Sequence, residues 1–283
     1  LLDPYSAARL VAVTSGVSAL AFCVTVIAVW GIERSTPAVV ARETAEKKNK
    51  TPFKVALREV WDEPQARRFT IFVFVSMLAY SMQDLILEPF AGLVFGMTPG
   101  ESTKLAGVQH GGVLTGMVLV ALVGSLAGGH KVGSLRFWTI GGCIASGLAL
   151  AGLAFAGNFG QSYPLEPSVF LLGLSNGAFA VAAIGSMMGL AGAGRSSREG
   201  VRMGLWGAAQ AIAFGVGGIV GAAGVDLMRF LGATPINAYG TVFALEGLLF
   251  VLAAVLAVRV GRTDVDEQRL GTFAPGQQLA ENG

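Results

Sequence analysis

Between Phe69 and Met97 the chain reads FTIFVFVSMLAYSMQDLILEPFAGLVFGM. This run is long enough to cross the hydrocarbon core of a bilayer as a helix. Two carboxylates, Asp84 and Glu88, interrupt it. Because an acidic side chain is costly inside a bilayer, such residues normally face the protein interior or a water-filled cavity and mark a functional site. The stretch therefore predicts a membrane-spanning helix that carries a candidate site.

The two acids are four residues apart, so a regular helix places them on one face, together with Tyr80 and Ser81. Pro89 has no backbone N–H and leaves the Leu85 carbonyl without its helical hydrogen bond, so we predict a kink. Asp84 lies roughly 22 Å along the axis from Phe69, past the bilayer middle. A kink beside two acids predicts a polar pocket open to the outer side. The opposite, lipid-facing side is predicted to carry Ile71, Phe74, Val75, Leu78 and Leu85.

Composition places the whole chain in a membrane. Its 283 residues are 53% hydrophobic and 13% charged, whereas a soluble domain has about 25% charged residues. We therefore predict an all-α polytopic membrane protein with seven transmembrane helices. The apolar spans run near Leu10–Ile32, Phe69–Phe95, Gly112–Ala127, Phe137–Ala156, Val169–Ala191, Met203–Leu231 and Ala238–Val260.

The distribution of basic residues predicts the orientation. If the spans alternate, three of the 20 Lys and Arg residues, Arg9, Lys104 and Arg229, lie on one side and the others on the opposite side. Cytoplasmic loops are enriched in Lys and Arg. The N-terminus is therefore predicted outside and the C-terminus in the cytoplasm. The cytoplasmic set is Arg34, Arg42, Lys47, Lys48, Lys50, Lys54, Arg58, Arg67, Arg68, Lys131, Arg136, Arg195, Arg198, Arg202, Arg259, Arg262 and Arg269.

The order of the spans predicts the domain organisation. An N-terminus that starts outside with Leu1, without a signal peptide, is explained most simply if the chain is the C-terminal part of a longer protein. Residues 1–32 would then be the last helix of an N-terminal half, and 69–262 a complete six-helix half. The linker 33–68 is predicted to carry an amphipathic helix over Thr51–Ala66, and 263–283 a polar cytoplasmic tail. Three plus three helices are typical of the nested inverted repeats of a major facilitator superfamily-like bundle.

Small residues predict how the helices pack. Pairs of glycines four residues apart allow close contact between backbones, which favours a tight bundle. Cys23 and Cys143 each lie within an apolar span and are predicted to be buried thiols. The glycine pairs are Gly112/Gly116, Gly124/Gly128, Gly173/Gly177, Gly185/Gly189 and Gly217/Gly221.

Few other side chains are candidates for a binding or catalytic role. Glu246 is a second deep acid, and Gln83, Asn176 and Gln210 are predicted either to bond across helices or to line a cavity. His110, after Gln109, is placed at the outer start of a short third span, where it is a candidate ligand for the magnesium of a chlorophyll; His130 is a weaker one. No phosphate loop, zinc spacing or Ser-His-Asp set is found, so we expect no enzyme and no resident metal.

Several of these stretches resemble one known family, the PucC/LhaA proteins. The resemblance lies in Ser81–Met97, in Thr98–Gly112 (TPGESTKLAGVQHGG), in Gly204–Gly215 (GLWGAAQAIAFG) and in Leu2–Ser6 at the start. It covers nearly the whole chain apart from the linker and the tail. That family is the bacteriochlorophyll-delivery branch of the major facilitator superfamily in phototrophic bacteria.

The resemblance implies a chaperone-like assembly factor for light-harvesting complexes in the inner, intracytoplasmic photosynthetic membrane. It implies bacteriochlorophyll as a transient ligand. Light-harvesting polypeptides are the implied partners, with the reaction centre or pigment-synthesis enzymes as further ones; lipids are expected and nucleic acid is not. The candidate binding residues are Gln83, Asp84, Glu88, Gln109, His110 and Glu246.

Two alternatives stay open at this point. The chain could be a proton-coupled solute transporter that uses Asp84, Glu88 or Glu246 as the proton carrier, because a carboxyl group in apolar surroundings takes up a proton readily. It could also be a structural partner that neither transports a solute nor binds pigment.

Overall fold

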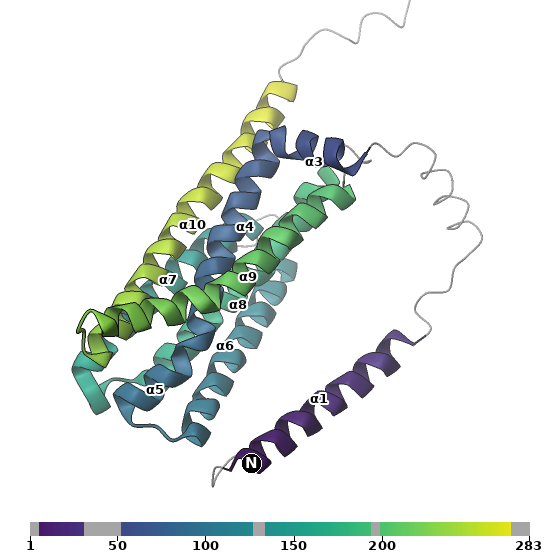
Figure 1. Ribbon diagram of the computed structural model, residues 1–283. Helices are drawn as coiled ribbons and strands as arrows, with labels where there is room; N and C mark the ends of the chain where they lie inside the picture. The colour runs from purple at the N-terminus through teal and green to yellow at the C-terminus, as the bar shows by residue number, and fades with distance from the viewer. Residues whose placement is uncertain (1–5, 31–51, 127–133, 194–198, 273–283) are drawn as a thin grey trace, which may run out of the picture.

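The computed structural model describes residues 6–30, 52–126, 134–193 and 199–272, and every regular element in these ranges is a helix (Figure 1). Six helices are long and apolar enough to cross a membrane, or seven if one bent pair is a single span. The predicted all-α polytopic membrane fold is therefore confirmed. The continuous long helices are α1 (Ala7–Val29), α6 (Pro99–Leu126), α7 (Leu135–Phe159), α8 (Leu165–Ala193), α9 (Glu199–Phe230) and α10 (Pro235–Thr272).

The bent pair is the span that carries the two acids. Helix α4 (Pro64–Met82) gives way to a 3-10 turn, η1 (Gln83–Leu85), and α5 (Leu87–Phe95) continues at an angle of 43°. The predicted bend is present, and Pro89 falls in the first turn of α5, where a missing N–H costs little. The prediction that both acids share one helix face is wrong. Asp84 lies in η1 and Glu88 in α5, so the break separates them.

The third span is longer than predicted. Helix α6 starts at Pro99, where the Thr98 hydroxyl accepts from the Glu101 N–H at 3.3 Å and the Glu101 carboxylate accepts from the Thr98 N–H at 2.8 Å. This reciprocal pair is a capping box, which fixes a helix start ahead of the apolar run. His110 is therefore not at the outer start of a span, as predicted, but roughly 17 Å along α6.

Glycine contacts hold the bundle together. Helix α6 packs along α8, α7 along α8 and α10, and α4 along α9 and α10. A side chain at Gly112 or Gly116 of α6, or at Gly173 or Gly177 of α8, would collide with the backbone of the facing helix. The predicted close packing is confirmed for these pairs. At two other predicted positions, Gly124 and Gly189, no atom lies within 4 Å of the place that a methyl group would take.

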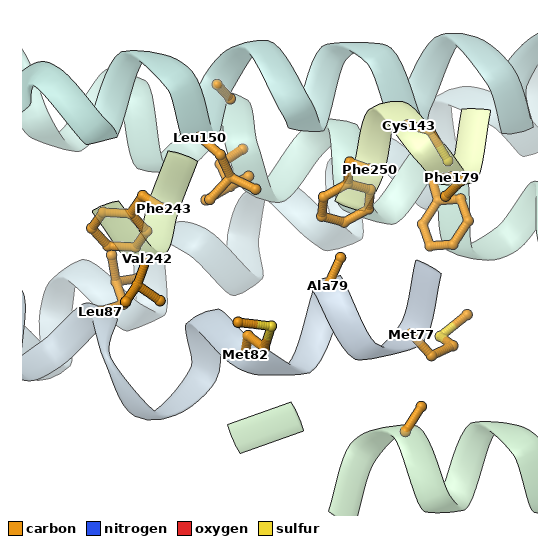
Figure 2. Close-up of a cluster of buried hydrophobic side chains, with 14 of the residues drawn as sticks. Met77, Ala79, Met82, Leu87, Cys143, Leu150, Phe179, Val242, Phe243 and Phe250 are labelled. Atoms are coloured by element: carbon orange, nitrogen blue, oxygen red, sulfur yellow. The ribbon is translucent and has the colours of Figure 1, made fainter. Parts of the chain in front are cut away.

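The interior of the bundle is apolar and aromatic. Figure 2 shows Met82 of α4 and Leu87 of α5 facing Leu150 of α7 and Phe243 and Phe250 of α10. These five side chains have exposed fractions of 2% or less. A well-packed core therefore covers the break in the α4–α5 span on the side that faces α7 and α10.

One ion pair joins separate elements at the end of the bundle where α9 begins. Arg202 of α9 is buried and donates to the Glu63 carboxylate at 2.5 and 3.2 Å, and Trp206 donates to the Ala66 carbonyl at 3.4 Å. The helix predicted over Thr51–Ala66 is α3 (Phe53–Asp62), with Ala56 and Val60 buried. It ends before Pro64, because a proline disfavours helical backbone in the residue before it.

Three further outcomes concern the ends of the chain and the thiols. No described residue of α1 is buried, and its Cys23 is exposed, unlike the buried Cys143. Helix α10 continues to Thr272, ten residues past Arg262, where a polar tail was predicted. His130 and most of its turn lie outside the described residues.

We expect Gly177→Ala to destabilise the protein by about 1–3 kcal/mol, because the added methyl group meets the Val113 carbonyl of α6. Gly189→Ala, on the same helix with open space beside it, is the matched control and should leave stability unchanged. Thermal unfolding in detergent, followed by tryptophan fluorescence, measures both. Equal melting temperatures for the two variants would contradict the close contact between α6 and α8.

Candidate functional site

Three of the predicted site residues come together around the break in the α4–α5 span. Asp84 of η1 is exposed, and it interacts electrostatically with His110 of α6. It also interacts with Tyr80, one turn earlier on α4, and with Glu246 of α10. Residues far apart in sequence therefore form one ionisable cluster on three helices, which we call the Asp84 cluster.

His110 is held in one tautomer. Its Nδ1 lies 2.8 Å from the Ala106 carbonyl oxygen, one turn earlier on α6. A carbonyl oxygen can only accept a hydrogen bond, so Nδ1 carries the proton, and in the neutral imidazole Nε2 keeps a free lone pair. Histidine side chains that bind metals are commonly oriented in this way, with the other ring nitrogen donating to a carbonyl or carboxylate. The exposed imidazole is thus prepared to act as a ligand through Nε2.

The surface of α6 around His110 is open. Gly107 and Gly111 flank it, and no atom lies within 4 Å of the position that a side chain would take at either residue. Leu114, one turn further along α6, is 64% exposed. A broad planar group can therefore approach the imidazole without meeting a side chain from either glycine.

Two polar side chains beside Asp84 are fully buried, and one of them, Glu246, belongs to the Asp84 cluster. Gln83 and Glu246 are both 0% exposed, and neither side chain has a hydrogen-bond partner. Burying a polar group without a partner is unfavourable, and for a charged group strongly so. Both residues are therefore costly polar groups in the described part of the bundle.

A second buried polar pair is satisfied. The Ser146 hydroxyl of α7 donates to the Asn176 side-chain oxygen of α8 at 2.7 Å. The predicted bond across helices at Asn176 is therefore confirmed, although its amide nitrogen has no partner. Sequence reasoning missed Ser146, since a serine in a glycine- and alanine-rich run gives no distinctive signal.

Two other candidates do not join the Asp84 cluster. Glu88 is exposed on α5, beyond the bend. Gln109 is buried on the other side of α6 from His110, where its backbone contacts Gly173 of α8. Sequence reasoning also missed the Arg202–Glu63 pair, whose signal was an arginine beside the apolar run of α9.

The fold and the Asp84 cluster define a polytopic membrane protein with an ionisable site on a broken transmembrane helix. Residues 1–265 match the family described as PUCC protein, and the chain belongs to that family.

Two named relatives match most of the chain. The chain is 54% identical, over 92% of its length, to the bacteriochlorophyll synthase 44.5 kDa chain of Rhodobacter capsulatus. It is 32% identical, over 95% of its length, to Protein PucC of Cereibacter sphaeroides. The chain spans 58% and 57% of these two relatives. These names support a photosynthesis-related role.

Neighbouring positions at the break should differ in access to water. In a background with Cys23 and Cys143 replaced by serine and alanine, we expect Asp84→Cys to react with a water-soluble maleimide at least ~10-fold faster than Gln83→Cys, because only the former position is exposed. Labelling of membrane vesicles, followed by mass measurement, gives both rates. An unreactive cysteine at position 84 would mean that this face meets lipid rather than water.

Proposed function

We propose that this protein binds bacteriochlorophyll in the photosynthetic membrane and holds it for assembly into light-harvesting complexes. The observation that carries the proposal is the free Nε2 of His110 on an open helix surface. The pigment is bound and passed on without chemical change. Light-harvesting polypeptides are its proposed recipients, and the reaction centre or pigment-synthesis enzymes are further partners.

The residues present fit a magnesium macrocycle. The His110 imidazole would hold the ring through its magnesium ion, because a neutral imidazole is a common metal ligand. The glycines beside His110 leave room for the ring to lie against α6. Ligand sites are mostly apolar surfaces with a few placed polar groups, and Tyr80 and Asp84 supply those groups next to the imidazole.

Family membership and the distribution of basic residues support a location in the photosynthetic membrane. Two relatives carry names linked to bacteriochlorophyll or to PucC. The excess of Lys and Arg on one side of the spans supports a cytoplasmic C-terminus. We therefore propose the bacterial inner membrane, in its intracytoplasmic photosynthetic part, as the site of action, and a major facilitator superfamily-like arrangement for the complete protein.

Replacing His110 should release the pigment. We expect the wild-type protein, purified from a bacteriochlorophyll-producing host, to carry pigment absorbance. His110→Ala should lose most of it, because the imidazole that would hold the magnesium ion is gone. Gly107→Leu should lose it too, since the new side chain occupies the open surface. Absorbance per protein, from the near-infrared band, is the measurement.

Gly189→Leu, at an equally open glycine on α8, is the control and should keep the pigment. Full pigment retention in His110→Ala would overturn the assignment of the ligand. Stable co-purification with light-harvesting subunits in the absence of any pigment would instead favour the role of a structural partner.

A proton-coupled transporter is the second candidate, and one observation favours it. Glu246 is buried and interacts with Asp84 beside a bent span, an arrangement in which a carboxyl group can take up and release a proton. Solute accumulation in vesicles under an imposed pH gradient, lost in Asp84→Asn but retained in Glu166→Gln, would support transport. Retention of uptake in Asp84→Asn would exclude this carboxyl group as the carrier.

A further inference from the structure

Helix α3 carries exposed basic residues at the end of the bundle where α4 and α9 begin. Figure 1 shows α3 turned across this end of α4. Ala56 and Val60 are buried where α3 packs on α4 and α9. Lys54, Arg58 and Trp61 are exposed, and their spacing of four and then three residues places them together on the side turned away from the bundle.

Two more basic residues follow the turn into α4. Arg67 and Arg68 are exposed in the first two turns of that helix. Ile71, four and three residues later, is 42% exposed and lies on the same side. Arginine side chains near the end of a membrane-spanning helix extend their charged groups to the level of the lipid headgroups, whereas exposed apolar side chains one turn deeper meet the acyl chains. The two arginines therefore mark the headgroup level on α4.

The protein does not neutralise this positive charge. Glu63, the acid between α3 and α4, is engaged by the buried Arg202. The four exposed basic side chains form no ion pair within the part of the chain that the structure describes. They outnumber the two remaining acids of α3, Glu59 and Asp62. The arginines of α4 also lie near its N-terminus, where the helix dipole favours an anion.

Exposed apolar side chains beside the basic ones restrict the class of partner. Trp61 and Val55 are 42% and 45% exposed on α3. A tryptophan near the end of membrane spans is typical of the membrane–water interface, where its ring lies at the headgroup level. Free phosphate would satisfy the basic groups and leave the apolar side chains in water. An anionic phospholipid satisfies both, because it brings a negative headgroup and an apolar chain together.

We propose that α3 and the start of α4 bind anionic phospholipids in the leaflet at this end of the bundle. The lipid phosphate groups accept hydrogen bonds from the four basic side chains, and Trp61 and Val55 contact the upper part of the acyl chains. This surface is separate from the Asp84 cluster, because Asp84 lies sixteen residues beyond Arg68, roughly 24 Å along the span. The proposal therefore does not depend on pigment binding.

Quenching of Trp61 fluorescence by brominated lipids tests the proposal. With Trp30 and Trp138 replaced by phenylalanine, the remaining tryptophans are Trp61 and the buried Trp206, which lipid does not reach. The full chain is reconstituted in phosphatidylcholine vesicles that contain a minor fraction of brominated phosphatidylglycerol. We expect this lipid to be enriched at least ~5-fold around Trp61, which is the effect of a single basic side chain at an anionic membrane surface. High salt should reduce the enrichment, because it screens the charges.

Variants of exposed residues complete the test. Arg58→Gln, Arg67→Gln and Arg68→Gln combined should remove most of the enrichment. Lys104→Gln, at an exposed basic residue at the opposite end of the bundle, is the matched control and should keep it. Equal quenching by brominated phosphatidylglycerol and brominated phosphatidylcholine in the parent protein would overturn the proposal, as would enrichment that survives in the triple variant. Absence of quenching by either lipid would mean that protein covers Trp61 and would overturn it too.

Discussion

An interrupted helix inside a bilayer needs other parts of the protein to cover its backbone, because lipid offers no hydrogen bonds to the freed groups. The break over Gln83–Ile86 imposes this constraint on the whole bundle. Helix α9 covers it on one side. Ser81 donates to the Ala213 and Phe214 carbonyls at 3.3 Å, and Gly217 and Gly221 bring the α9 backbone against Ser81 and Met82.

Helix α10 covers the other side of the break, where aromatic packing replaces backbone contact. Phe243 packs edge-to-face against Phe90 of α5 with ring centroids 5.0 Å apart, and Tyr239 lies 5.6 Å from the same ring. The bend is therefore held between α9, which contacts it through glycines, and α10, which contacts it through aromatic side chains. Because packed interfaces of this kind resist deformation, Asp84 is held in a defined position toward α6.

The same arrangement separates two environments that are adjacent in sequence. Asp84 is exposed and interacts with His110 of α6, whereas Gln83 is fully buried in the bundle. Adjacent residues of a regular helix, such as Gln83 and Asp84, also point in different directions. The break adds a change in the direction of the chain at α5. One short turn can thus serve an exposed ligand site and a buried polar site.

The sequence by itself determined the membrane class, which follows from the length of the apolar runs, and it indicated a bend near Pro89. The break lies just before that proline, which falls in the first turn of α5. The sequence could also identify Asp84, His110 and Glu246 as unusual, because polar groups in apolar runs are costly. It placed His110 wrongly, because the capping box at Thr98 extends α6 through residues too polar to read as a span. The prediction that Asp84 and Glu88 share one helix face was wrong as well, because the bend between them interrupts the regular helical period.

Only the tertiary structure decided which polar residues meet. Asp84, His110 and Glu246 come from three separate parts of the chain, and their grouping depends on how the helices pack in the bundle. It also decided that Gln83 and Glu246 are buried without partners, while Asn176 finds Ser146. A sequence specifies the period and polarity of each helix, but the rotation and neighbours of each helix are set by packing against all the others.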